Sequence, residues 1–70
     1  MSKDKGDWEL VYTSAEEYKI LIVKELLEEE NIKSYEINKR DSSYLFGTFE
    51  LYVLGADVIK AKLIIQKSGL

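Results

Sequence analysis

The stretch that decides the fold is AEEYKILIVKELLEEEN, residues 15–31, which predicts an amphipathic helix. Ser14 precedes it as a good N-cap, and Glu17 stands three residues on, where it can bond back to the N–H of the cap in a capping box. Asn31 ends the helix, because Asn tolerates the left-handed backbone that often follows a last turn. Ile32 then returns the chain to the core.

The apolar residues of this helix recur at helical spacing and form one broad arc. Charged residues such as Glu25 and Glu28 fall opposite, although Leu21 lies in the middle of this charged face. We therefore expect the apolar arc to pack on a sheet. The residues expected in the core are Ala15, Ile20, Ile22, Val23, Leu26 and Leu27.

The segment before the helix, residues 8–13, alternates with the period of two that is typical of a strand with one buried face. We expect its more apolar side to face the core. The expected core side is Trp8, Leu10 and Tyr12, and the expected open side is Glu9, Val11 and Thr13.

Two later segments alternate in the same way. Residues 34–39 contain the apolar pair Tyr35 and Ile37, and residues 48–54 form the clearest strand of the chain. Turn-forming residues occupy positions 40–47 between them, which predicts a hairpin loop. The open side of these two strands is expected to carry Ser34, Glu36, Asn38, Thr48, Glu50, Tyr52 and Leu54.

A second helix is expected after the last strand. Gly55 can cap it, Asp57 lies in its first turn where the helix dipole favours a carboxylate, and Gly69 lies just past its end at about residue 67. This helix has two apolar stripes on different sides. The core stripe is Val58, Ala61, Ile64 and Ile65, and the other stripe is Ile59 and Leu63.

The element order βαββα predicts an α+β fold, a ferredoxin-like sandwich with a three-stranded sheet and two helices on one face. The two strands joined by the first helix run parallel through a right-handed crossover, and the third strand inserts between them. The alternative topology has the second strand in the centre. In the first arrangement the strand at residues 8–13 is a bare edge, which invites pairing. We expect one domain, residues 8–70, after a flexible lead-in at residues 1–7.

Composition excludes several classes of function. The chain has no Cys and no His, so disulfides, thiol or histidine catalysis and ordinary zinc sites are excluded. Its formal net charge of −3 argues against a nucleic-acid partner. Residues 1–7 lack an apolar signal region and the longest apolar run is residues 20–23, so we expect no membrane span and a cytoplasmic protein.

Several short motifs resemble a small bacterial family of unknown function, described as "putative prokaryotic signal transducing protein". The similarity covers about residues 8–65, nearly the whole domain. The resemblance implies a ferredoxin-like fold grouped with the PII-type signalling proteins, and it carries no catalytic motif. The first motif is LLEEENI at residues 26–32, which Val23 precedes. The others are Gly47, FELYV at residues 49–53 and ADVIKAKLII at residues 56–65.

This chain departs from the family pattern at two positions. Ile20 stands where the family usually has a small residue, and Asn31 stands where the helix usually ends in Gly. PII proteins carry their partner-binding loop between the second and third strands, which corresponds here to the shorter loop at residues 40–47. The basic, Gly-rich residues that would hold ATP are missing, so nucleotide binding is not expected.

Three surfaces are candidates for function. A small domain with a bare edge and an apolar open face can enlarge its core by joining a second copy, so we expect a homodimer. The loop can contact a protein partner through its aromatic residues; the alternative is that Phe46 packs on the sheet with Tyr44 beside it. The candidates are Val11, Tyr52 and Leu54 for self-association, Arg40, Tyr44 and Phe46 for the loop, and Leu21, Ile59 and Leu63 for a second apolar surface.

The favoured function is a non-enzymatic regulatory or protein-interaction module that associates with itself through its sheet. Glu9, Glu36 and Glu50 are expected on the open face, but no nucleophile completes an acid–base site with them. No cofactor or metal is expected. The alternative function is a small-ligand sensor, with its site at a dimer junction or under the loop at residues 40–47.

Overall fold

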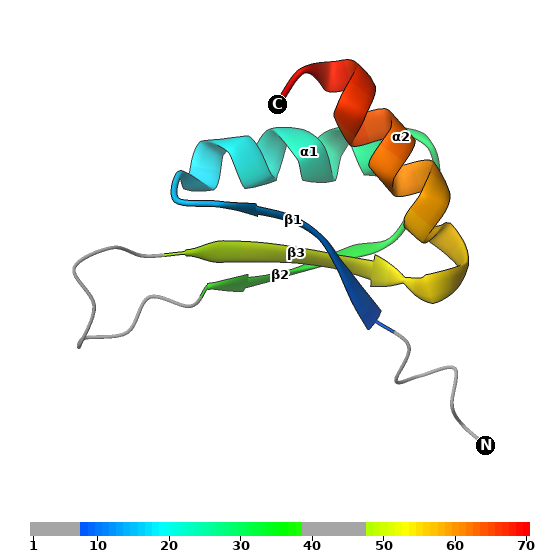
Figure 1. Ribbon diagram of the computed structural model, residues 1–70, viewed down its shortest axis with the longest axis horizontal. Coiled ribbons are helices and arrows are strands. Elements are labelled where there is room, and N and C mark those ends of the chain that lie inside the picture. Colours follow the sequence, from blue (N-terminus) through cyan, green and yellow to red (C-terminus); the bar gives the residue numbers. More distant parts are fainter. Residues whose placement is uncertain (1–7, 39–47) are drawn as a thin grey trace.

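The computed structural model describes residues 8–38 and 48–70. Its sheet has the strand order β1-β3-β2, with β3 antiparallel to both neighbours. Both helices lie on one face of the sheet (Figure 1). This confirms the predicted α+β, ferredoxin-like arrangement with the third strand in the centre. The elements are β1 Trp8–Ser14, α1 Glu17–Glu29, β2 Ser34–Asn38, β3 Phe49–Leu54, the 3-10 turn η2 Gly55–Asp57 and α2 Val58–Ser68.

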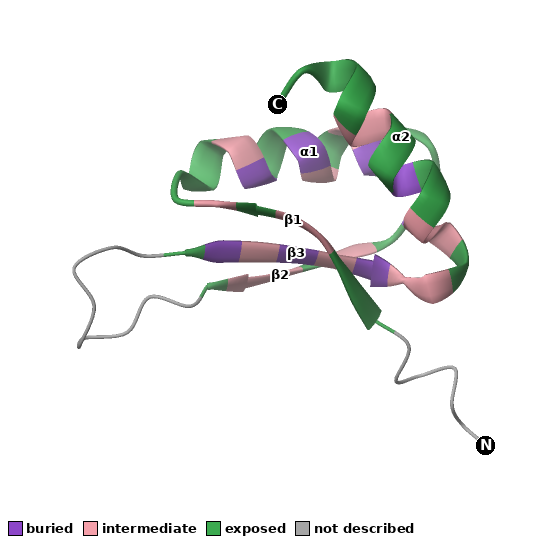
Figure 2. Ribbon diagram, viewed as in Figure 1, coloured by how far each residue is buried: buried purple, intermediate pink, exposed green. Residues whose placement is uncertain are grey.

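The core lies between the sheet and the two helices. Every second residue of β3 is buried (Figure 2), and these residues form one core cluster with buried residues of both helices. Removal of this apolar surface from water is the main source of stability for so short a chain. The fully or almost fully buried residues are Ile20, Val23, Leu27, Ile32, Phe49, Leu51, Val53 and Ala61.

The buried stripe of α1 is narrower than the sequence predicts. Ile20, Val23 and Leu27 are buried, but Ile22 is 41% exposed and Ala15 lies exposed before the helix begins. The expectation that Ile22 and Ala15 belong to the core is therefore wrong. A single sheet covers α1 from one side, so a stripe with the spacing i, i+3, i+7 is all that it buries.

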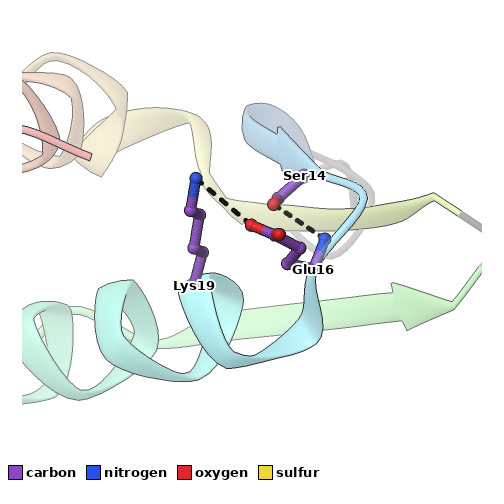
Figure 3. Close-up of polar contacts among 3 residues, drawn as sticks. All are labelled: Ser14, Glu16 and Lys19. Carbon is purple, nitrogen blue, oxygen red and sulfur yellow. Dashed lines mark hydrogen bonds and ion pairs between the residues drawn. The ribbon is translucent and has the colours of Figure 1, made fainter.

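The start of α1 also differs from the prediction. The helix begins at Glu17 and its N-cap is Glu16, so Ser14 and Glu17 make no capping box. Ser14 remains in β1, paired with Phe49, and its hydroxyl accepts a hydrogen bond from the Glu16 N–H at 3.0 Å (Figure 3). Lys19 closes the turn by contacting the Glu16 carboxylate at 3.3 Å. Pairing in the strand therefore displaces the expected cap by two residues.

The end of α1 follows the prediction. Asn31 has a positive φ of 62°. Its N–H donates to the Glu28 carbonyl oxygen and the Ile32 N–H donates to the Leu27 carbonyl oxygen, both at 2.9 Å. This is the Schellman pattern, and its usual apolar contact is available because Ile32 and Leu27 are both buried. The helix end thus anchors the first residue that leads into β2.

A β-bulge in β1 reverses the expected faces for the first part of that strand, up to Val11. Leu10 pairs with Tyr52 and Tyr12 pairs with Leu51, so Val11 is the extra residue. Before the bulge, Trp8 and Leu10 share the face of Leu54 and Tyr52, away from the helices. Val11 itself packs against the core together with Tyr12. The prediction is right for Tyr12 and wrong for Trp8, Leu10 and Val11.

The faces of β2 are also opposite to the prediction. Tyr35 pairs with Tyr52 and Ile37 pairs with Glu50, which lie on the face away from the helices. Residues directly opposite each other in an antiparallel pair point to the same side. The residues of β2 and β1 that share the helix side, contrary to expectation, are Ser34, Glu36, Asn38 and Glu9.

The second helix is close to its prediction. Gly55 begins the turn η2 instead of capping the helix, and Asp57 is the N-cap of α2 without a side-chain hydrogen bond. Gly69 ends α2 with a φ of 79°. Ala61 is buried, and the rest of the expected core stripe packs against the core: Val58, Ile64 and Ile65.

Candidate functional site

The face of the sheet that the helices leave uncovered is largely apolar. We call this surface the open face. Among the residues that the structure describes, Glu50 is its only charged side chain, and six of its members are large apolar or aromatic residues. From the strand pairing, the open face consists of Trp8, Leu10, Thr13, Tyr35, Ile37, Glu50, Tyr52 and Leu54.

Three aromatic rings gather on the open face and cross all three strands. The ring centroids of Trp8 and Tyr35 are 5.6 Å apart, and those of Tyr35 and Tyr52 are 6.4 Å apart. Both pairs are tilted, within the range in which aromatic rings attract one another. Trp8 is still 37% exposed, Tyr35 51% and Leu10 43%.

The single carboxylate of the open face is held by a neighbour. The Tyr52 hydroxyl donates to Glu50 Oε1 at 2.7 Å. This hydrogen bond, followed by burial, raises the pKa of Tyr52 above its ordinary value. Because the Glu50 carboxylate already accepts this hydrogen bond, covering the open face with another surface would cost less free energy than burying a carboxylate without a partner.

The three glutamates expected to share the open face are separated. Glu50 lies there, but Glu9 and Glu36 lie on the helix side, opposite Val53 and Leu51. The pKa of Glu36 is raised, first by burial and then by a hydrogen bond and repulsion from Glu17, while Lys24 partly offsets this. The arrangement does not bring these carboxylates together as an acid–base pair.

A solvent-open pocket of about 430 Å³ lies beside the start of β2. Trp8 and Tyr35 line it from the sheet, and Glu28 and Asn31 line it from the end of α1. Its volume falls within the range of small-molecule sites, roughly 300–1,000 Å³. Ser34 and Tyr35 open β2 and line the pocket, which therefore lies at the opposite end of the strand from Asn38.

The structure places the predicted site residues differently. Tyr52 and Leu54 are on the open face, but Val11 packs against the core and cannot belong to that face. The predicted loop contacts, Arg40, Tyr44 and Phe46, lie outside the described residues. The third predicted surface is exposed on both helices: Leu21 by 50%, Ile59 by 77% and Leu63 by 52%.

The sequence does not predict half of the open face or any of the pocket. Trp8, Leu10, Tyr35 and Ile37 were assigned to the core because they are apolar. The faces of β2 can be derived from Ile32, which is buried in the core. Alternate residues of a strand point to the same side, so Ser34 and Glu36 lie on the core side with Ile32. No glycine or other local signal marks the bulge at Val11.

Two features are absent from the described part of the chain. Among residues 8–38 and 48–70, no group of three or more acidic side chains is placed to hold a metal ion. In the same residues, neither helix has the length and apolar character needed to cross a bilayer.

Comparison with protein families gives one match over almost the whole chain. The family described as "Putative prokaryotic signal transducing protein" matches residues 8–69, which confirms the resemblance seen in the sequence motifs. No curated protein and no solved structure matches the chain.

Proposed function

We propose, from the premise that the chain belongs to the family described as "Putative prokaryotic signal transducing protein", that it is a non-enzymatic regulatory module which associates with a second copy of itself. The association surface is the open face. The family description supports a role in signalling, and the open face supports the means by which the module acts.

The observation that carries this proposal is the apolar and aromatic character of the open face. Trp8, Leu10 and Tyr35 remain well exposed there, whereas an ordinary solvent-facing side of an antiparallel sheet is polar. Contiguous apolar patches of this kind mark interaction sites. A second copy suits the patch because two identical open faces would bring few like charges together. The carboxylate of Glu50 is the exception, and it is already hydrogen-bonded to Tyr52.

The size of the open face predicts a weak association. Three strands about 4.8 Å apart and about five residues at 3.3 Å each give an area of roughly 240 Å². A stable interface buries about 800 Å² on each partner. Packing of the open faces alone therefore supports a concentration-dependent dimer, and contacts along the free edge of β1 would add to it.

The test compares two apolar-to-acid substitutions on opposite sides of the molecule. Leu10→Glu places a carboxylate in the open face, and Ile59→Glu makes the same charge change on α2, at a residue that is 77% exposed. Sedimentation over a wide concentration range should show a dimer for the wild type and for Ile59→Glu. Leu10→Glu should weaken the association by at least about tenfold, because a charge would be buried without a partner.

Two outcomes would overturn the proposal. The wild type could remain monomeric at every concentration, or Leu10→Glu and the wild type could associate equally well. If only Ile59→Glu dissociates the dimer, the surface on the helices is the interface instead. Val11→Glu is unsuitable for this test, because Val11 packs against the core and its substitution would lower the stability of the fold.

A further inference from the structure

The pocket beside β2 has an aromatic wall. Trp8 and Tyr35 line it, with their ring centroids 5.6 Å apart and their planes at 49°. Both rings are only partly covered by the rest of the chain. A wall of this kind favours a ligand with a flat apolar group, because aromatic rings pack well against tilted or offset rings.

The rim of the pocket carries one charge of each sign. Glu28 lies in the last turn of α1, and Lys33 lies just before β2. Within the described residues, neither side chain has an ion-pair partner, and the two do not pair with each other. A cationic group beside Glu28 and an anionic group beside Lys33 would therefore each meet an uncompensated charge.

Ser34, which also lines the pocket, supplies an unpartnered hydroxyl. Its Oγ atom is buried and has no hydrogen-bond partner in the described part of the chain. A buried hydroxyl without a partner is unfavourable, and nearly all such groups in folded proteins are bonded. A ligand carboxylate near Lys33 would offer this hydroxyl the acceptor that it lacks.

We infer that this pocket binds a small zwitterionic molecule with an aromatic ring, an aromatic α-amino acid in chemical class. The ring packs on Trp8 and Tyr35, the ammonium group lies toward Glu28, and the carboxylate lies toward Lys33 and Ser34. Trp8 and Tyr35 also belong to the open face, so a bound ligand and a second copy would compete for these two rings. The ligand would lie at the start of β2, at the opposite end of that strand from Asn38.

The chain contains a built-in reporter for the test. Trp8 is its only tryptophan and lines the pocket; because Trp8 also belongs to the open face, its fluorescence reports on the pocket only while the protein is monomeric. Phenylalanine is the probe, because it does not absorb where tryptophan is excited. We expect a saturable change in emission with a dissociation constant on the order of 1 mM, as is typical for a ligand of this size in an open site.

Comparison ligands separate the contributions of the ring and of the two charges. Leucine lacks the ring, phenylacetate lacks the ammonium group, and phenethylamine lacks the carboxylate. All three should bind more weakly than phenylalanine. A response to leucine as strong as that to phenylalanine, or no saturable response to phenylalanine, would overturn the assignment. Equal binding of phenylacetate and phenylalanine would overturn the role of Glu28 and with it the zwitterion.

Matched variants test the individual residues. Lys33→Gln should weaken phenylalanine and phenylacetate binding roughly two- to fivefold and leave phenethylamine binding unaffected. Glu28→Gln should weaken phenylalanine and phenethylamine binding by a similar factor and leave phenylacetate binding unaffected. Lys62→Gln, on α2 and away from the pocket, is the control. Unchanged binding by Lys33→Gln, or an equal loss in Lys62→Gln, would contradict the assignment.

Ser34→Ala has an expected signature that a purely structural role would not give. It should weaken phenylalanine binding but raise the melting temperature of the free protein, because it removes an unpartnered buried hydroxyl. A fall in both would show that Ser34 serves the fold and not the ligand. All titrations are run at a protein concentration where sedimentation finds monomer, so their outcome is independent of whether the open face dimerises.

Discussion

Glu36 shows how a single side chain on the helix side of the sheet makes stability depend on pH. Burial raises its pKa first, and the hydrogen bond and repulsion from Glu17 add to this. The folded chain therefore holds the Glu36 proton more tightly than the unfolded chain, whose ordinary value is 4.5. The contribution of Glu36 to stability is fully present below that value and is lost as the pH rises through the higher pKa of the folded state.

This residue gives a prediction about neutral pH. Glu36→Gln cannot ionise, so it should raise the melting temperature at neutral pH and have a smaller effect below pH 4.5, the ordinary value. Glu17→Gln should act in the same direction because it removes the repulsion. Glu25→Gln, on the exposed side of α1, is the control. Thermal unfolding at both pH values measures the difference, and an equal effect of Glu36→Gln at both would contradict it.

At the scale of the element, the end of α1 gives a second prediction. Asn31 holds a φ of 62°, which costs an ordinary L-residue about 1–2 kcal/mol. Asn31→Ala should lower the free energy of unfolding by about 1 kcal/mol. Asn31→Gly should stay within about 0.5 kcal/mol of the wild type, because Gly accepts this backbone but loses more entropy on folding.

Urea unfolding measures both Asn31 variants against a control in the last helical turn. Glu29→Ala keeps a right-handed backbone and removes an exposed side chain, so its effect should be within about 0.5 kcal/mol. If Asn31→Ala is as stable as Asn31→Gly, the left-handed residue does not govern how α1 ends.

The elements also show which part of the fold can be predicted from sequence. Apolar spacing located both helices and all three strands, and the pattern of β3 predicted its buried side correctly. A period of two gives the alternation of a strand but not which side faces the core. For β1 the bulge at Val11 changes that side within the strand, and its cause lies in the pairing with β3, which no local pattern encodes.

The candidate site was partly predictable for the same reason. Tyr52 and Leu54 were placed correctly because they alternate with the buried residues of β3. Tyr35 was placed in the core because it is apolar, although its strand is an edge of the described sheet and the helix side there is occupied by Glu36. The pocket combines residues from β1, α1 and β2, so only the assembled fold brings them together.

At the scale of the whole molecule, the open face and the net charge act against each other. The open face favours association because it removes apolar surface from water. The formal net charge of −3 makes two copies repel each other across distances that salt screens, with a Debye length of about 10 Å at 0.1 M. The charges lie mostly outside the open face, since Glu50 is its only charged member.

The balance predicts the direction of the salt dependence. Raising sodium chloride from about 0.05 M to about 0.5 M should lower the dissociation constant of the dimer by roughly twofold, because it screens the repulsion and leaves the apolar contact intact. Leu10→Glu, which adds one negative charge to each open face, should associate more weakly and respond more strongly to salt. Sedimentation at matched concentrations measures both proteins. If salt instead weakens the wild-type dimer, ion pairs hold it together. Because the described residues of the open face include one carboxylate and no cation, the dimer would then not rest on these residues alone.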